Sequence, residues 1–133
     1  LNRDAAVNLS KQFLGIQYLW GGKSPKGFDC SGLIQTIFNA MGVVLPRDSG
    51  DQSHYFINHI IIREEAQPGD LHFFGTEKSV THVAMEIGHG EYLHCQGWVK
   101  EESFDKNQPN YNKKLEVSYL HTVSMEKCLN QNH

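Results

Sequence analysis

One cysteine in this sequence has the surroundings of a nucleophile. Cys30 follows Asp29, a residue type that caps helix N-termini, and apolar residues recur after it at helical spacing. These residues are Leu33, Ile34, Ile37, Phe38 and Met41. Cys30 therefore falls in a first helical turn, where unpaired backbone N–H groups and the positive end of the helix dipole favour the thiolate over the thiol. Such a group can attack a carbonyl carbon, and the rest of the chain must supply its base.

Two histidines are placed to act on that thiol. Residues 81–87 and 91–96 flank a Gly-His-Gly turn at 88–90, a pattern that predicts a β-hairpin. Counting pairs outward from the turn puts His82 and His94 on one face as diagonal neighbours. A register shifted by two residues would set them directly opposite each other, still on that face. One imidazole could then take the thiol proton while the second fixes the tautomer of the first.

Each of these residues also has an ordinary structural interpretation. Cys30 could be an inert buried thiol, and the two histidines could be satisfied polar residues of the sheet. A zinc site would need Cys30, His82, His94 and Cys95, but adjacent strand residues point to opposite faces, so Cys95 is turned away from His94. We therefore expect no metal and no cofactor, and we assign Cys95 to the core. The other histidines are predicted to be surface or loop residues: His54, His59, His72, His89, His121 and His133.

The segment before the cysteine joins aromatic residues to a Gly-rich loop that lets the backbone turn sharply. The phenol of Tyr18 could reach over this loop and form an oxyanion hole together with the backbone N–H of Cys30. The alternative for Tyr18 is a place in the core. Trp20 is interpreted as a packing residue.

The order of elements predicts the fold class. Predicted helices cover 3–14, 30–41 and a short stretch capped by Asp48 or Ser49. Predicted strands cover 71–74, 81–87, 91–96 and 115–123, with a strand or buried crossing at 60–62. Residues 100–114 are expected to form a long polar loop, and the last ten residues, with Cys128, a frayed tail. Helices followed by antiparallel strands are typical of an α+β domain.

Bulk properties narrow the class of protein further. The chain has 133 residues, which predicts a single domain with a core at about 3–123. Its net charge of −3 argues against nucleic-acid binding. No run approaches the roughly 18 apolar residues of a membrane span. Three cysteines without CxxC spacing argue against a disulfide scaffold, and a start on Leu1 predicts a mature or excised fragment.

Taken together, these motifs resemble the NlpC/P60 family of papain-like cysteine peptidases. The resemblance is carried by YLWGG (18–22), FDCSGL (28–33), LPRDSGDQ (45–52), PGDLHFF (68–74), THVAMEI (81–87) and LHCQG (93–97). It implies a papain-like fold in which the nucleophile helix packs on an antiparallel sheet. It also implies Cys30 as nucleophile, His82 as general base and His94 as the orienting third member. The order Cys-His-His separates the chain from relatives whose third group is Asn or Asp.

The resemblance further implies a substrate. Family members cut peptidoglycan stem peptides, typically between γ-D-glutamyl and the following diamino acid, diaminopimelate or lysine. Where a free N-terminal L-Ala is required, the residues flanking the nucleophile bind its ammonium group. In this sequence the substrate-binding candidates are Asp29, Ser31, Arg47, Asp48 and Ser49. A solvated loop is the simpler interpretation of the last three.

The sequence departs from the family pattern at two points. Glu86 shares the face of His82, where it either lies in solvent at the hairpin end or alters the cleft. Amine-requiring members usually carry N-terminal SH3-like domains, so this chain is expected to be an excised catalytic domain or a lone enzyme. The predicted partners are therefore stem peptides or murein fragments, with partner domains possible outside this chain.

Two other functions stay open at this stage. A non-catalytic module could bind cell-wall peptide, although a pure binder has no use for Cys30, His82 and His94 together. A cysteine acyltransferase or amidase could act on another amide, and an added amine acceptor would separate transfer from hydrolysis. The substrate alone suggests a place in the cell envelope or outside the cell, or in the cytoplasm for the recycling of murein fragments.

Overall fold

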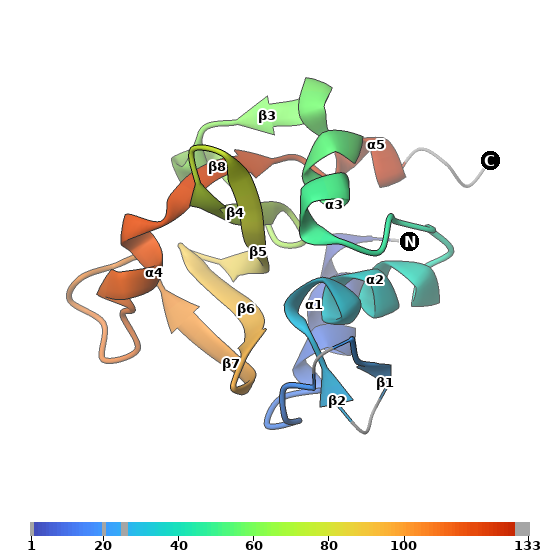
Figure 1. Cartoon of the computed structure of the whole chain (residues 1–133), viewed down its shortest axis with the longest axis horizontal. Coiled ribbons are helices and arrows are strands. Elements are labelled where there is room, and N and C mark those ends of the chain that lie inside the picture. The colour runs from blue at the N-terminus through green and yellow to red at the C-terminus, as the bar shows by residue number, and fades with distance from the viewer. Residues whose placement is uncertain (1, 20, 25–26, 130–133) are drawn as a thin grey trace.

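A six-stranded antiparallel sheet forms the middle of the computed structural model, with strand order β3-β8-β4-β5-β6-β7 (Figure 1). The structure describes residues 2–19, 21–24 and 27–129. The predicted roles of Trp20 and His133 lie outside the described residues. The helices are α1 Arg3–Lys11, α2 Cys30–Ala40, α3 Ser49–Tyr55, α4 Lys113–Val117 and α5 Glu126–Leu129, with short 3-10 turns η1 Ile57–His59 and η2 Arg63–Glu65. The sheet strands are β3 Ile60–Ile61, β4 Leu71–Thr76, β5 Ser79–Gly88, β6 Glu91–Gln96, β7 Trp98–Ser103 and β8 Tyr119–Val123.

The sheet divides the core into two parts. Helices α1, α2 and α3 lie to one side of it and α4 lies to the other (Figure 1). On the side of α2, the buried cluster contains the helix residues Leu33, Ile34 and Ile37 and the strand residues Val83 and Leu93. A smaller cluster on the other face contains Phe74, Ala84, Tyr92, Phe104 and Leu115. The α+β class and the packing of the cysteine helix on the sheet agree with the prediction.

The start of α2 is fixed by local contacts that the sequence indicated. Asp29 is the N-cap, and its Oδ1 accepts the N–H of Gly32 at 2.6 Å. The small hairpin β1 (Lys23–Ser24) and β2 (Gly27–Phe28) precedes it. A Cβ on Gly32 would collide with the carbonyl oxygen of Gly22, which itself accepts the N–H of Asp29 at 2.9 Å. Glycine at position 32 therefore lets the Gly-rich loop close against the first turn and hold Cys30 in place.

The register of the β5–β6 hairpin is the one counted from the sequence. Met85 pairs with Leu93 and Glu86 pairs with Tyr92, before a bulge next to the turn. Since alternate residues share a face, His82 and His94 project to the same side of the sheet. The opposite face carries Val83, Met85, Leu93 and Cys95 in the core, as expected.

Several predicted elements are wrong in detail. The helix over 3–14 ends at Lys11. Of the two alternatives for 60–62, the strand is confirmed at Ile60–Ile61, an edge strand with Ile60 exposed, and the buried crossing is wrong. Residues 98–103, assigned in part to a polar loop, form strand β7 beside β6. The segment 115–123 is divided between α4 and β8, and β8 lies inside the sheet between β3 and β4.

The C-terminal segment is also more ordered than predicted. Residues 126–129 form the short helix α5, and both Met125 and Cys128 are fully buried. The main-chain N–H of Met125 donates to the buried carboxylate of Asp70 at 2.9 Å. The hydrophobic contacts and this hydrogen bond hold the segment on the domain, so it is not a frayed tail. In the described part of the chain, no helix is long and apolar enough to cross a membrane.

Candidate active site

Cys30 lies at the beginning of α2, against strand β5. Its side chain is partly buried and packs on the main core cluster, and its Sγ lies 4.0 Å from the carbonyl oxygen of Thr81. A pocket of about 310 Å³ opens over the thiol. Its lining contains Tyr18, Cys30, Thr81, His82, Cys95, Gln96 and Gly97. The pocket thus brings together the predicted nucleophile, base and oxyanion residue.

A chain of hydrogen bonds leads away from His82. Its Nε2 lies 2.7 Å from Nδ1 of His94, and Nε2 of His94 lies 2.6 Å from Oε1 of Glu102. The carboxylate of Glu102 also accepts a hydrogen bond from Nδ2 of Asn112 at 3.0 Å. Because His82 uses Nε2 toward His94, its Nδ1 is the nitrogen available to the thiol of Cys30.

Burial has the largest effect on the pKa values of Cys30 and His82. Burial raises the pKa of the Cys30 thiol, although hydrogen bonds from backbone N–H groups, including that of Val83, act in the opposite direction. Burial also lowers the pKa of His82 to about 3, with a contribution from the neighbouring His94. Burial therefore opposes the thiolate that the helix terminus was predicted to favour, and it favours a neutral thiol beside a neutral imidazole.

Tyr18 lines the same pocket as Cys30. The residue forms a bridge with Phe28, and its N–H donates to the carbonyl of Gly97 at 2.8 Å. Burial, followed by the nearby Cys30, raises the pKa of its phenol. The hydroxyl therefore keeps its proton at neutral pH and can donate a hydrogen bond to a developing oxyanion beside Cys30.

The substrate-binding candidates separate into two groups. Arg47 donates to both carboxylate oxygens of Asp29, at 3.0 and 2.8 Å, and to Oγ of Ser31 at 3.0 Å. This hydrogen bond with Asp29 is the main cause of a raised Arg47 pKa. Asp48 is exposed at the N-cap position of α3, without a capping hydrogen bond from its side chain, and Ser49 is buried in the first turn. The charge of Asp29 is thus already paired, while that of Asp48 faces solvent.

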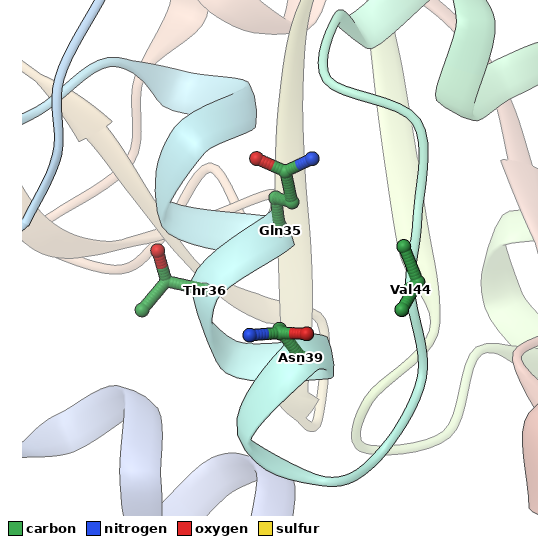
Figure 2. Close-up of a pocket in the computed structure, with 4 residues that line it drawn as sticks. All are labelled: Gln35, Thr36, Asn39 and Val44. Atoms are coloured by element: carbon green, nitrogen blue, oxygen red, sulfur yellow. The ribbon is translucent and has the colours of Figure 1, made fainter.

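The pocket over Cys30 continues beyond His82. A second pocket of about 450 Å³ shares Thr81, His82 and Gln96 with the first and extends to α4. Its further lining residues are Asn112, Lys114, Leu115 and Ser118. A separate hollow of about 320 Å³ on the outer surface of α2 is lined by Gln35, Thr36, Asn39 and Val44, away from the cysteine (Figure 2).

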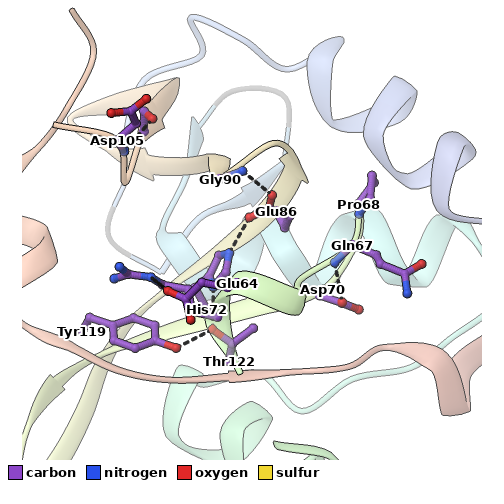
Figure 3. A network of polar contacts seen from close by, with 12 residues as sticks. Glu64, Gln67, Pro68, Asp70, His72, Glu86, Gly90, Asp105, Tyr119 and Thr122 are labelled. Carbon is purple, nitrogen blue, oxygen red and sulfur yellow. Dashed lines mark hydrogen bonds and ion pairs between the residues drawn. The ribbon is translucent and has the colours of Figure 1, made fainter. Parts of the chain in front are cut away.

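A second histidine–glutamate pair lies in the same sheet. Nε2 of His72 lies 2.8 Å from Oε1 of Glu86, and Nδ1 of His72 lies 2.8 Å from Oγ1 of Thr122 (Figure 3). The other carboxylate oxygen of Glu86 accepts the N–H of Gly90 at 2.9 Å. Both predictions for these residues are wrong: His72 is fully buried, and Glu86 lies neither in solvent nor in the pocket over Cys30.

The other predicted surface residues are distributed as follows. His54 and His89 are exposed and His59 is half-buried, while His121 is half-buried with its Nε2 2.8 Å from Oγ of Ser53. Cys95 is buried and reaches the carbonyl oxygen of Phe28, although it also lines the pocket over Cys30. Within the described ranges, no group of three or more His, Cys, Asp or Glu side chains could hold a metal ion.

Sequence reasoning missed Glu102 because residues 100–114 were assigned to a loop. A signal was available, since Gly97 follows one predicted strand and the strand-favouring residues Trp98 and Val99 come directly after it. Gln96 pairs with Trp98 across this turn, which sets Tyr92 opposite Glu102. The count that placed the two histidines on one face would have placed Glu102 beside them.

Comparisons with known proteins reveal similarity in sequence and in fold. A sequence model of a protein family, described as "NlpC/P60 family", matches residues 15–121 of this chain. A Bacillus cereus protein named gamma-D-glutamyl-L-lysine dipeptidyl-peptidase is 46% identical over 112 residues, which cover 81% of this chain but 33% of that protein. This chain thus spans about a third of that relative's length.

Solved structures agree in fold. The crystal structure of an NlpC/P60 family protein from Bacillus cereus superposes with a TM-score of 0.79 at 38% identity, covering 93% of this chain and 40% of that one. The NlpC/p60 domain of the peptidoglycan hydrolase SagA gives a TM-score of 0.78 at 29% identity, covering 94% of this chain and all of that domain.

Proposed function

This chain belongs to the NlpC/P60 family, and from that premise we propose that it is a cysteine endopeptidase acting on peptidoglycan stem peptides. The bond we assign is the amide between γ-D-glutamyl and the following diamino acid, diaminopimelate or lysine. The name of the Bacillus cereus relative supports this choice of bond. The observation that carries the proposal is the pocket shared by Cys30, His82 and Tyr18, with His94 behind His82.

The first half of the reaction forms a thioester. The thiol proton of Cys30 moves to Nδ1 of His82 as the sulfur attacks the γ-glutamyl carbonyl carbon. The phenol of Tyr18 and the backbone N–H of Cys30 donate hydrogen bonds to the resulting oxyanion. When the intermediate collapses, the C–N bond breaks and His82 gives the same proton to the leaving amine.

The second half releases the acyl group. His82, again neutral, takes a proton from a water molecule that attacks the thioester carbon. The C–S bond breaks, the γ-carboxyl product leaves, and the sulfur recovers a proton from His82. The protein needs no co-reactant other than water for this cycle.

The pockets suggest where the two halves of the substrate lie. His82 must protonate the leaving amine, so the diamino acid departs on the side of His82, into the second pocket. Lys114 lines that pocket and is exposed. Its ammonium group can pair with the side-chain carboxylate of diaminopimelate, which lysine lacks. Replacing Lys114 with Ala should lower kcat/KM for diaminopimelate peptides by up to about 5-fold relative to lysine peptides, whereas Lys113→Ala should not.

Recognition of the substrate's N-terminus is assigned to the other side of Cys30. Because Arg47 already pairs with Asp29, we assign the attraction for an N-terminal ammonium chiefly to the exposed Asp48. Further candidates are Ser49, the next residue, and Ser31, whose Oγ accepts a hydrogen bond from Arg47. An exposed charge contributes little, about 1 kcal/mol or less. The preference for a free amine is accordingly expected to be modest in this chain alone.

The decisive experiment uses mass spectrometry on L-Ala-γ-D-Glu-diaminopimelate and its N-acetylated form. Release of L-Ala-D-Glu by the protein, but not by its Cys30→Ala variant, supports the endopeptidase. Loss of preference for the free amine in Asp48→Asn supports the amine site.

If neither peptide is cut and iodoacetamide does not alkylate Cys30, the chain is a binding module for cell-wall peptide. Product formed with an added amine acceptor in place of water would identify an acyltransferase. The proposed substrate places the protein in the cell envelope or outside the cell, with cytoplasmic recycling as the alternative.

A further inference from the structure

The hydrogen-bond chain behind His82 continues past His94. Glu102 on β7 accepts from Nε2 of His94, and Asn112, the N-cap of α4, donates to the same oxygen. His94 is fully buried, while the Glu102 side chain keeps 17% of its exposure. We propose that Glu102 is a positioning residue that fixes the direction of this chain, so that His82 presents an unprotonated Nδ1 to Cys30.

Two neutral imidazoles in contact can be arranged in two ways. In the first, His82 donates from Nε2–H to Nδ1 of His94, and Nδ1 of His82 remains an acceptor. In the second, His94 donates from Nδ1–H to His82, whose proton must then sit on Nδ1. The second arrangement cannot take a proton from Cys30. The contact of 2.7 Å between the rings is compatible with either arrangement.

A carboxylate at the far end removes this ambiguity. An ionised carboxylate only accepts hydrogen bonds, so Nε2 of His94 must carry the proton that Glu102 receives. A neutral His94 then has an unprotonated Nδ1, which must accept from Nε2–H of His82. Nδ1 of His82 is therefore left without a proton. The direction follows from Glu102 and not from either histidine.

The charges around the chain support these protonation states. Burial raises the pKa of Glu102, but hydrogen bonds from His94 and Asn112 outweigh it and leave the pKa below its ordinary value. Burial lowers the pKa of His94, against the opposing effect of Glu102. Lys100, also on β7, favours the neutral form of both histidines. The other ionisable groups facing this region are Tyr92, Tyr111, Glu116 and Arg63.

Two variants separate the two effects of Glu102. Glu102→Ala removes both the acceptor and the charge that stabilises an imidazolium at His82. Glu102→Gln keeps an acceptor, because Nδ2 of Asn112 donates to the same oxygen and so selects the carbonyl oxygen of the amide for that place. Glu101→Gln is the matched control, since Glu101 precedes it on the other face of β7 and approaches Lys11 only at 3.9 Å.

The direct test is nitrogen NMR of the protein labelled with ¹⁵N-histidine. Long-range proton–nitrogen correlations should show His94 in the Nε2–H form in the wild type, in Glu102→Gln and in Glu101→Gln. In Glu102→Ala the rings of both His82 and His94 should sample both tautomers. An Nδ1–H tautomer of His94 in the wild type, or an unchanged tautomer in Glu102→Ala, overturns the inference.

The kinetic test follows alkylation of Cys30 by iodoacetamide across pH, with Cys30→Ala as the background. Glu102→Ala should slow alkylation at neutral pH, and kcat on a stem peptide, by roughly 10- to 100-fold, by analogy with the loss of the hydrogen-bond partner of a metal-binding histidine. Glu102→Gln should lose less, and Glu101→Gln nothing. A wild-type rate in Glu102→Ala contradicts the inference.

The catalytic meaning of this inference rests on the proposed function, but the alkylation and NMR readouts do not. If the wild type cuts no stem peptide while Glu102→Ala still slows alkylation and mixes the tautomers, the proposed substrate is wrong and the role of Glu102 stands.

Discussion

Two histidine–glutamate pairs lie on the same face of one sheet and differ in what the second ring nitrogen meets. Both join Nε2 of a fully buried histidine to Oε1 of a glutamate on the next strand, at 2.8 Å for His72–Glu86 and 2.6 Å for His94–Glu102. Nδ1 of His72 meets the hydroxyl of Thr122, whereas Nδ1 of His94 meets His82.

This difference distinguishes the His72–Glu86 pair, which only holds strands together, from the His94–Glu102 pair, which leads to the pocket over Cys30. A hydroxyl can donate or accept, so Thr122 satisfies His72 in either tautomer, and it also contacts the hydroxyl of Tyr119 at 2.6 Å (Figure 3). The pair is closed on itself and ties β4, β5 and β8 together. The second pair ends at a ring that borders the pocket of the cysteine. A buried histidine–carboxylate pair therefore indicates catalysis only when the second ring nitrogen of the histidine is connected to a candidate nucleophile.

The largest expected effect is the loss of activity when His82 is removed from the hydrogen-bonded series His82–His94–Glu102. His82→Ala should lower kcat by on the order of 10⁴-fold or more, because among the described residues that line the pocket over Cys30 it is the only histidine or carboxylate that could take the thiol proton. Stem-peptide turnover with a matched unfolding curve measures the effect. His72→Ala is the control at the other pair and should lose stability, with kcat per folded molecule unchanged. Residual turnover within 10-fold of wild type in His82→Ala would contradict the proposed base.

A smaller effect on a different quantity is expected at Glu86. Glu86→Ala leaves Nε2 of His72 and the N–H of Gly90 buried without their acceptor, which should lower the free energy of unfolding by about 2–4 kcal/mol. Urea denaturation measures this loss, and kcat should not change. The reverse pattern is expected for Glu102→Ala, which acts on activity. A Glu86 variant that loses turnover at full stability would erase the distinction between the pairs.

The pH dependence should also distinguish them. Since burial lowers the pKa of His82 to about 3, the acid limb of kcat/KM should lie well below the pH of about 6.5 expected of an unperturbed histidine. Burial raises the pKa of Cys30, so the alkaline limb should lie above the ordinary thiol value. The unfolded chain binds a proton at His82 that the folded one resists, so stability should fall as pH drops below about 6.5 toward 3.

Rate and stability profiles of the wild type and His82→Ala test these signs. His82→Ala should lose stability less steeply over that range, while Glu86→Gln should keep the wild-type positions of both activity limbs. An acid limb near pH 6.5 would show that His82 is solvated, contrary to its position in the fold.

The smallest effect on stability is expected at Thr122, which contacts Nδ1 of His72 in the His72–Glu86 pair. Thr122→Val keeps the shape of the side chain but removes the hydroxyl shared by His72 and Tyr119, which should cost about 1–2 kcal/mol. Thermal or urea unfolding measures the loss. Turnover should be unaffected, and reduced turnover without lost stability would link this pair to the active site.

The sequence carried most of the candidate site because its signals are local. Asp29 and the apolar spacing after Cys30 predicted the helix start, and a short turn set the register that brings His82 and His94 together. The same local logic failed at β7, where Glu102 was hidden in a stretch that appeared too polar for a strand. The polar side chains of an active site weaken the alternation that predicts strands.

The other wrong predictions concern burial, which local sequence patterns do not show. Glu86 and His72 are types that favour the surface, yet each supplies the other with a partner inside the sheet. The pairing of Arg47 with Asp29 joins residues that are distant in sequence, so local patterns did not predict it.

The sequence by itself placed Cys30 at the start of a helix and His82 and His94 on one face of a hairpin, because helix caps, turns and alternation act over a few residues. Only the tertiary structure decided how far burial raises the pKa of Cys30 and lowers that of His82, since desolvation depends on everything packed around them. It also decided which of two similar histidine–glutamate pairs faces the cysteine. Hydrogen-bond direction depends on the last acceptor in the chain, and Glu102 reaches that place only when β7 closes the edge of the sheet.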